Sequence, residues 1–221
     1  MTALRLAVFD CDGTLLDSQA NIVRAMVECF ASEGMSPPDA RAVRRIVGLS
    51  LPQAMAALLP DADEDLHHRL ADCYKRAFQR MRRDGELDHE PMFDGIGALL
   101  SRLSTAGWLL AVATGKSDRG LQIALGHHGI TDHFISLQTA DRHPSKPHPS
   151  MLLTAMADAG VKAADAVMIG DTHFDIHMGT AAGVRALGVS WGYHDGEELL
   201  AAGAAGVALD AGHLERLLHG A

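Results

Sequence analysis

This 221-residue sequence has only three cysteines, few aromatic residues and no long apolar run. Cys11, Cys29 and Cys73 are odd in number and far apart, which argues against a disulfide framework and against a cysteine-based zinc site. No stretch approaches the roughly 18 apolar residues that identify a membrane-spanning helix. The apolar run at the N-terminus reaches acidic residues too soon for a signal peptide. We therefore expect a cytoplasmic protein with no membrane partner.

Positive charge is also scarce in this sequence. Lys and Arg number 19 against 28 Asp and Glu, which gives a formal net charge of −9. Binding along a nucleic acid requires a basic face, so we expect no nucleic-acid partner. The acidic excess indicates cations or small molecules as ligands. Hydrophobic residues at 48% and charged residues at 21% are typical of a folded globular protein.

Short apolar runs alternate with helical patterns over most of the chain. The predicted strands are residues 4–9, 109–113, 134–137, 166–169 and 185–189, with a weaker edge strand at 206–209. The predicted helices between them are residues 96–106, 117–126, 150–159 and 174–182. This alternation is typical of βαβ units. It predicts an α/β fold with a Rossmann-like parallel sheet and helices on both faces.

Residues 18–90 interrupt the alternation, and four helices are predicted there. Asp17 or Ser18 can cap the first helix, which ends at Gly34 and carries an apolar stripe of Ile22, Val23, Met26, Val27 and Phe30. The others cover about 39–47, a segment opened by a Ser50–Gln53 capping box, and 63–83. We therefore predict an inserted all-helical cap domain over 18–90, and an α/β core domain formed by residues 1–17 and 91–221.

Polar groups follow the predicted strands at the edge where ligands bind in open α/β sheets. They are, in chain order, Asp10 and Asp12, then Thr114, then Lys146, and finally Asp171 with Asp175. Each alone is a weak signal, because an Asp at a strand end often only caps the next helix. The ordered set indicates a functional site.

This set of groups is typical of phosphoryl transfer through an aspartyl-phosphate. Clustered carboxylates repel one another and need a hard cation, and Mg²⁺ takes carboxylate and phosphate oxygens as ligands. The metal holds the phosphoryl group in line and neutralises charge. One carboxylate serves as nucleophile, and a second, two residues along, as general acid and then base. Lys146, the Thr114 hydroxyl and backbone N–H groups would bind the negative charge of the phosphoryl group.

The segments 10–18 and 170–175, with Thr114 and Lys146, resemble the four motifs of the haloacid dehalogenase-like hydrolase superfamily. The resemblance covers essentially the whole chain, including a helical C1-type cap inserted after the first motif. Within the superfamily the sequence looks most like the phosphoglycolate phosphatase group. The resemblance implies a Mg²⁺-dependent phosphatase that acts on a small-molecule phosphomonoester. The oligomeric state is left open.

The resemblance also implies the catalytic and metal-binding residues. Asp10 would be the nucleophile, and Asp12 the general acid and base. Asp10, the backbone carbonyl of Asp12, and Asp171 would hold Mg²⁺. Asp175 would support the metal through its waters and position Lys146. An Asp at the position of Asp12 argues against the dehalogenase and phosphonatase branches.

Substrate-binding residues are implied on both domains. Thr114 would bind the phosphoryl group, together with the backbone N–H groups of Gly13 and Gly115. Many relatives carry a side-chain amide at the position of Gly115. In this family the cap closes over the substrate, and its specificity turn contains Gly48. We expect Arg45, just before this turn, to meet a substrate carboxylate or a second phosphate; the alternative is an exposed charge on a short helix.

Two other functions compete with this prediction. A β-phosphoglucomutase has a similar cap, but with cations and a His where this sequence has Val47, Leu51 and Ile22, which favours hydrolysis. A receiver-type signalling domain also gathers Asp, Thr and Lys around Mg²⁺, but it is shorter and lacks both the helical insert and the Asp171–Asp175 pair. The substrate stays open among phosphoglycolate, a sugar phosphate, a nucleotide and pyrophosphate.

Overall fold

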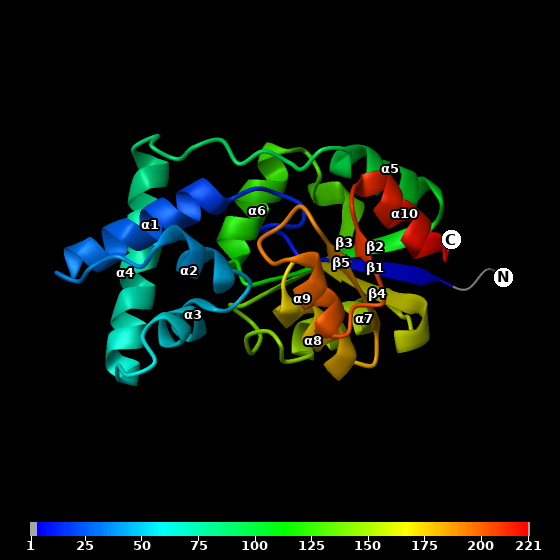
Figure 1. The fold of residues 1–221 in the computed structure, drawn as a ribbon. Coiled ribbons are helices and arrows are strands. Elements are labelled where there is room, and N and C mark those ends of the chain that lie inside the picture. The colour runs from blue at the N-terminus through cyan, green and yellow to red at the C-terminus, as the bar shows by residue number, and fades with distance from the viewer. Residues whose placement is uncertain (1–3, 221) are drawn as a thin grey trace.

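A computed structural model describes residues 4–220 (Figure 1). Within this range six strands form one parallel sheet in the order β3-β2-β1-β4-β5-β6. Their bounds are β1 (Arg5–Phe9), β2 (Trp108–Thr114), β3 (Phe134–Thr139), β4 (Ala166–Gly170), β5 (Arg185–Val189) and β6 (Val207–Ala208). The α/β prediction is therefore confirmed. Because β1 lies between β2 and β4, its carboxyl end has the ends of both strands as neighbours.

Helices cover both faces of the sheet, as predicted. Side chains alternate along β1, so that Ala7 and Phe9 join one apolar cluster and Leu6 and Val8 join the other. The first cluster includes residues of α5 (Ile96–Thr105), α6 (Asp118–His127) and α10 (Ala211–His219). The second includes residues of α7 (Ser150–Ala159), α8 (His173–Ala181) and α9 (Gly196–Ala201). The sequence analysis did not predict α9 and α10. Two short 3₁₀ turns, η1 (Thr131–His133) and η2 (Ala163–Asp165), precede β3 and β4.

Residues 18–90 contain four helices and no strand, and they lie to one side of the sheet (Figure 1). The helices are α1 (Gln19–Ser32), α2 (Ala40–Arg45), α3 (Leu51–Leu58) and α4 (Glu64–Arg83). Their buried faces form an apolar cluster of their own, separate from the two clusters of the sheet. We call residues 18–90 the cap; their status as a separate domain stays a prediction.

Two helices of the cap, α4 and α3, differ in how their N-termini are capped. Asp63 caps α4, since its side chain accepts the N–H of Leu66 at 2.8 Å. The predicted Ser50–Gln53 capping box is wrong, because the Ser50 side chain caps no described N–H group. The Ser50 N–H, which Gln53 was expected to satisfy, instead donates to Ser145 Oγ at 2.7 Å. This bond ties the start of α3 to the loop between β3 and α7.

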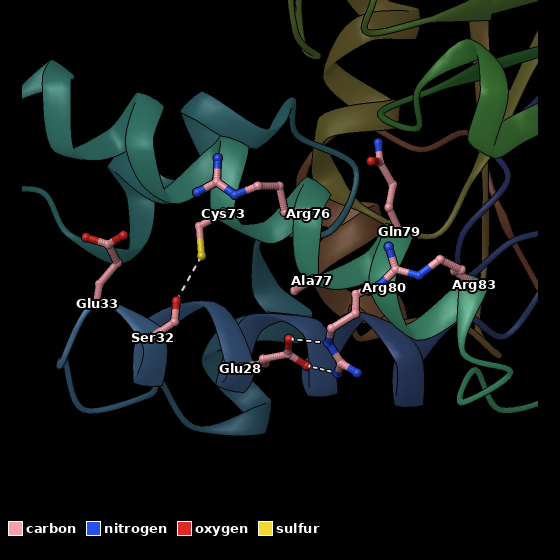
Figure 2. Close-up of a pocket in the computed structure, with 9 residues that line it drawn as sticks. All are labelled: Glu28, Ser32, Glu33, Cys73, Arg76, Ala77, Gln79, Arg80 and Arg83. Carbon is pink, nitrogen blue, oxygen red and sulfur yellow. Dashed lines mark hydrogen bonds and ion pairs between the residues drawn. The ribbon is translucent and has the colours of Figure 1, made fainter.

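Several charges on the cap are paired with one another. In a shallow groove between α1 and α4, Arg80 Nε and Nη2 donate to the two carboxylate oxygens of Glu28 at 2.9 and 2.6 Å (Figure 2). The pKa of Glu28 is held below its usual value by these hydrogen bonds. Glu28 and Arg80 therefore offset each other's charge in this groove, and its lining contains none of the strand-end carboxylates described below.

The three cysteines are free and buried. Packing of α1 against α4 places Cys73 Sγ 3.7 Å from the carbonyl oxygen of Cys29, although 44 residues separate them in the sequence. No helix among residues 4–220 combines the length and apolar character needed to cross a membrane.

Candidate active site

Asp10 lies directly beyond β1, and its side chain is buried. Its N–H continues the pairing with β4 by donating to the Ile169 carbonyl at 2.9 Å. Oδ1 accepts the N–H of Cys11 at 2.6 Å, whereas buried Oδ2 has no hydrogen-bond partner among the described residues. Burial raises the pKa of Asp10 to about 7, against the opposing charge of Lys146. One oxygen of Asp10 is thus held in place and the other is free to react or to bind a cation.

Lys146 bridges two carboxylates from different strand ends. Its ammonium lies 2.8 Å from Asp10 Oδ1 and 2.7 Å from Asp175 Oδ1, and all three side chains are buried. Burial alone would lower the pKa of Lys146, but the two carboxylates outweigh this effect and raise it. The ammonium therefore stays charged at the centre of the site, where it offsets part of the carboxylate repulsion.

Asp171 and Asp175 are fixed by their neighbours at the end of β4. Asp171 accepts the Thr14 hydroxyl at 2.8 Å and the Tyr193 N–H at 2.9 Å. Asp175 Oδ2 accepts the N–H of Thr172 at 3.1 Å and its hydroxyl at 2.7 Å, in a capping box at the start of α8. Burial raises the pKa of Asp171, and the charges of Asp10 and Asp175 raise it further. This repulsion is relieved when a cation binds.

The site fits a hard divalent cation. Asp10, Asp171 and Asp175 each offer one carboxylate oxygen, and these oxygens lie within 4.8 Å of one another. An all-oxygen set of buried carboxylates suits Mg²⁺. Asp12 was predicted to hold the metal through its backbone carbonyl, and that role stays a prediction; its carboxylate is not one of these three groups.

The Asp12 carboxylate is instead turned toward Lys116. Lys116 Nζ lies 2.7 Å from Asp12 Oδ1, and the two side chains are only 13% and 10% exposed. Residues two apart in a regular strand share a face, but the chain bends at Cys11, and Asp10 and Asp12 pair with different lysines. The sequence analysis gave Lys116 no role. Its place in the loop after the strand end, two residues beyond Thr114, was the signal available.

Close backbone approaches explain two of the predicted glycines. Gly13 has φ +82°, and a Cβ there would come 2.2 Å from Asp171 Oδ2, so both its conformation and the space require glycine. At Gly115 a Cβ would come 2.8 Å from the carbonyl oxygen of Leu49 and 2.9 Å from that of Gly48. The cap turn that contains Gly48 therefore lies directly against the loop after β2.

The remaining predicted residues lie in two places. Thr114 is buried at the end of β2, where its hydroxyl accepts the N–H of Lys116 at 3.2 Å. Arg45, at the end of α2, forms an ion pair with Glu198 on α9. This pair joins the cap to α9 and occupies the guanidinium that was expected to meet the substrate. The substrate role of Arg45 stays a prediction.

Comparison with known proteins agrees with this arrangement. The family described as haloacid dehalogenase-like hydrolase matches residues 7–189. A Dickeya dadantii protein named "Probable phosphatase IndB" is 37% identical over 89% of this chain and 86% of its own length. A Vibrio parahaemolyticus phosphoglycolate phosphatase is 28% identical over 90% of this chain and 89% of its own.

Solved structures give the same result. A crystal structure titled as a "predicted phosphatase" from Clostridium acetobutylicum superposes with a TM-score of 0.89 at 26% identity, and each chain is covered completely. The sequence match and this superposition both include the helices of the cap and the strand ends that carry the carboxylates. The chain belongs to the haloacid dehalogenase-like hydrolase family.

Proposed function

We propose that this protein is a Mg²⁺-dependent phosphatase that hydrolyses a small phosphomonoester of the phosphoglycolate type through an aspartyl-phosphate on Asp10. The observation that carries the proposal is the buried bridge of Lys146 between Asp10 and Asp175, beside Asp171. A lysine at this point leaves the cluster with an excess of negative charge that suits one divalent cation. The names of the relatives support the same reaction class.

The metal would be held by Asp10 and Asp171, with the backbone carbonyl of Asp12 and the support of Asp175. When bound, Mg²⁺ supplies charge neutralisation for the phosphoryl oxygens and holds the phosphoryl group in line. Lys146 binds further negative charge on the same group. The Thr114 hydroxyl and the N–H groups near it hold the remaining phosphoryl oxygens.

In the first step, Oδ2 of Asp10 attacks phosphorus as the bond between phosphorus and the ester oxygen breaks. Asp12 gives its proton to that oxygen, and the alcohol leaves. In the second step, Asp12 takes a proton from a water molecule that attacks phosphorus. The bond to Asp10 breaks, which releases phosphate and restores both carboxyl groups to their starting states.

The cap turn closes the site above this chemistry. The contact of Gly115 with the carbonyls of Leu49 and Gly48, and the bond from Ser50 to Ser145, hold the turn against both loops of the sheet domain. A closed roof excludes water from the first step and strengthens the electrostatic interactions beneath it. The closed space suits a small substrate.

A phosphate-release screen tests the proposal. The purified protein with Mg²⁺ is given phosphoglycolate, glucose phosphates, nucleoside monophosphates and pyrophosphate, with Asp10→Asn as the matched control. We expect phosphate release from a small phosphomonoester and a residual activity of Asp10→Asn below about 1%. Incubation with β-glucose 1-phosphate tests the mutase alternative, because a mutase would yield glucose 6-phosphate in place of free phosphate.

A further inference from the structure

The proposed reaction assigns a role to Lys146 but none to the other buried lysine of the site. Lys116 contacts Asp12 at 2.7 Å, whereas Lys146 contacts Asp10 and Asp175. In the proposed reaction Asp12 donates a proton to the departing alcohol, so the alcohol oxygen must lie beside it. In that reaction the Lys116 ammonium would lie on the alcohol side of the substrate, beside Asp12.

Lys116 is a cation in a nearly closed space. Burial alone would lower the pKa of its ammonium, but the nearby Asp12 carboxylate outweighs burial and raises it. The preceding residue, Gly115, lies against the carbonyls of Leu49 and Gly48 in the cap turn. A buried ammonium under this roof requires an anion or several acceptors close by. Asp12 provides one partner, and Asp12 must also serve the departing oxygen.

Hydrogen-bond donors without acceptors lie in the same region. The Tyr193 hydroxyl is buried and has no partner in the part of the chain that the structure describes, and the same holds for Ser18 Oγ. Burial and the charge of Asp12 keep the pKa of Tyr193 above its usual value, so its hydroxyl keeps its proton. Buried hydroxyl donors without acceptors can bind an anion.

The other cation considered for this role is engaged elsewhere. Arg45 forms its ion pair with Glu198 on the outer helix α9, and both side chains are 41% exposed. Lys116 is more buried and lies within hydrogen-bond distance of the proposed general acid. A cation in a desolvated place contributes more to selectivity than one in contact with solvent.

We propose that Lys116 binds an anionic group on the alcohol portion of the substrate, so that the enzyme selects short phosphomonoesters whose alcohol carries a carboxylate. This proposal rests on the phosphatase function proposed above. It adds the residue that recognises the alcohol and the charge which that residue recognises.

The test compares two substrates of matched size, phosphoglycolate and 2-hydroxyethyl phosphate, in which a hydroxymethyl group replaces the carboxylate. The measured quantity is the ratio of the two kcat/KM values. The wild-type ratio should favour phosphoglycolate, and Lys116→Met should lower it about 30-fold, the loss expected for one charged hydrogen bond. Lys116→Arg, which keeps the charge, should retain most of the preference. Lys75→Met, which removes an exposed lysine paired with Asp72 on the cap, is the matched control and should not change the ratio.

Each outcome has one meaning. A wild-type enzyme that hydrolyses both esters without preference overturns the inference and leaves the phosphatase function intact. A wild-type enzyme that hydrolyses no phosphomonoester overturns the proposed function itself. A ratio unchanged in Lys116→Met, or lowered by Arg45→Met instead, also contradicts the assignment. If Lys116→Met does not fold, competitive inhibition of the wild type by glycolate but not by ethylene glycol supports it, and equal inhibition by both contradicts it.

Discussion

Lys146 Nζ lies 2.8 Å from Asp10 Oδ1, and neither side chain is reached by solvent. Buried ion pairs are most costly when one partner is lost, because the other charge is then left without compensation. We predict that Lys146→Met lowers the free energy of unfolding by about 3–5 kcal/mol and abolishes phosphate release. Urea denaturation monitored by circular dichroism measures the first effect. Lys75→Met, at an exposed pair with Asp72, should change stability by less than about 1 kcal/mol, and equal effects of the two variants would contradict the account.

The raised pKa of Asp10 predicts that this residue destabilises the metal-free protein. Between its ordinary value of 3.8 and about 7, the native state binds a proton that the unfolded state has released, so stability falls as pH rises. The Asp10→Asn variant cannot titrate at this position, so it should be more stable than the wild type at pH 8 in the presence of a chelator. Each kcal/mol gained in the free energy of unfolding should raise Tm by about 2–4 °C. The difference should shrink toward pH 4. A constant difference, or a lower Tm of the variant at every pH, would argue against a protonatable buried Asp10.

Binding of a divalent cation should offset the destabilisation that Asp10 causes in the metal-free wild type. Mg²⁺ placed among Asp10, Asp171 and Asp175 binds only the native state, so it should raise Tm, with about 2.7 kcal/mol gained at a concentration one hundred times Kd. Asp171→Asn should lose most of this shift. Asp118→Asn, which removes an acid paired with Arg142 outside the cluster, is the control and should retain it. Calorimetric titration of both variants measures the affinities directly, and an unchanged shift in Asp171→Asn would refute the metal site.

The close approach of Gly115 to the cap turn can be tested by a substitution that adds one methyl group. The backbone of Gly115 is not in the left-handed region, so Gly115→Ala should fold, but its Cβ would lie 2.8 Å from the Leu49 carbonyl oxygen. The turn must then move, and we predict that kcat/KM falls at least about tenfold, since small displacements at a reacting site are costly. In Gly126→Ala, on α6, the added Cβ meets open space. That variant should keep its kcat/KM and gain about 0.5–1 kcal/mol in stability, and a similar loss in both variants would contradict cap closure at Gly115.

The sheet could be predicted from the sequence because parallel strands carry a strong local signal. The run ending at Phe9 is buried on both faces and stops at Asp10, and the observed strand Arg5–Phe9 differs from the prediction at one residue. The prediction for Arg185–Val189 matches the observed bounds. The edge strand predicted at 206–209 is present but comprises only Val207–Ala208. The six-residue helix α9 is too short to show a helical periodicity in the sequence and was not predicted.

The candidate site could be predicted in part, because strand order brings Asp10, Lys146, Asp171 and Asp175 to one edge once the topology is known. The partner of Asp12 could not be predicted in the same way. Which lysine lies beside it depends on the bend at Cys11, where the regular alternation of a strand no longer applies. The pairing of Arg45 with Glu198 depends on how the cap lies on the sheet domain, and local sequence contains no information about that placement.

The central claim is that Asp10 becomes phosphorylated, and chemical trapping tests it most directly. The enzyme is mixed with Mg²⁺ and phosphoglycolate, quenched in denaturant during turnover, and reduced with borohydride, which converts an aspartyl-phosphate to homoserine. Peptide mass spectrometry then locates the reduced residue, with enzyme lacking substrate as the control. The account predicts homoserine at position 10 and nowhere else. Reduction at Asp12 or Asp171, or none at position 10 in an enzyme that is turning over, would contradict it.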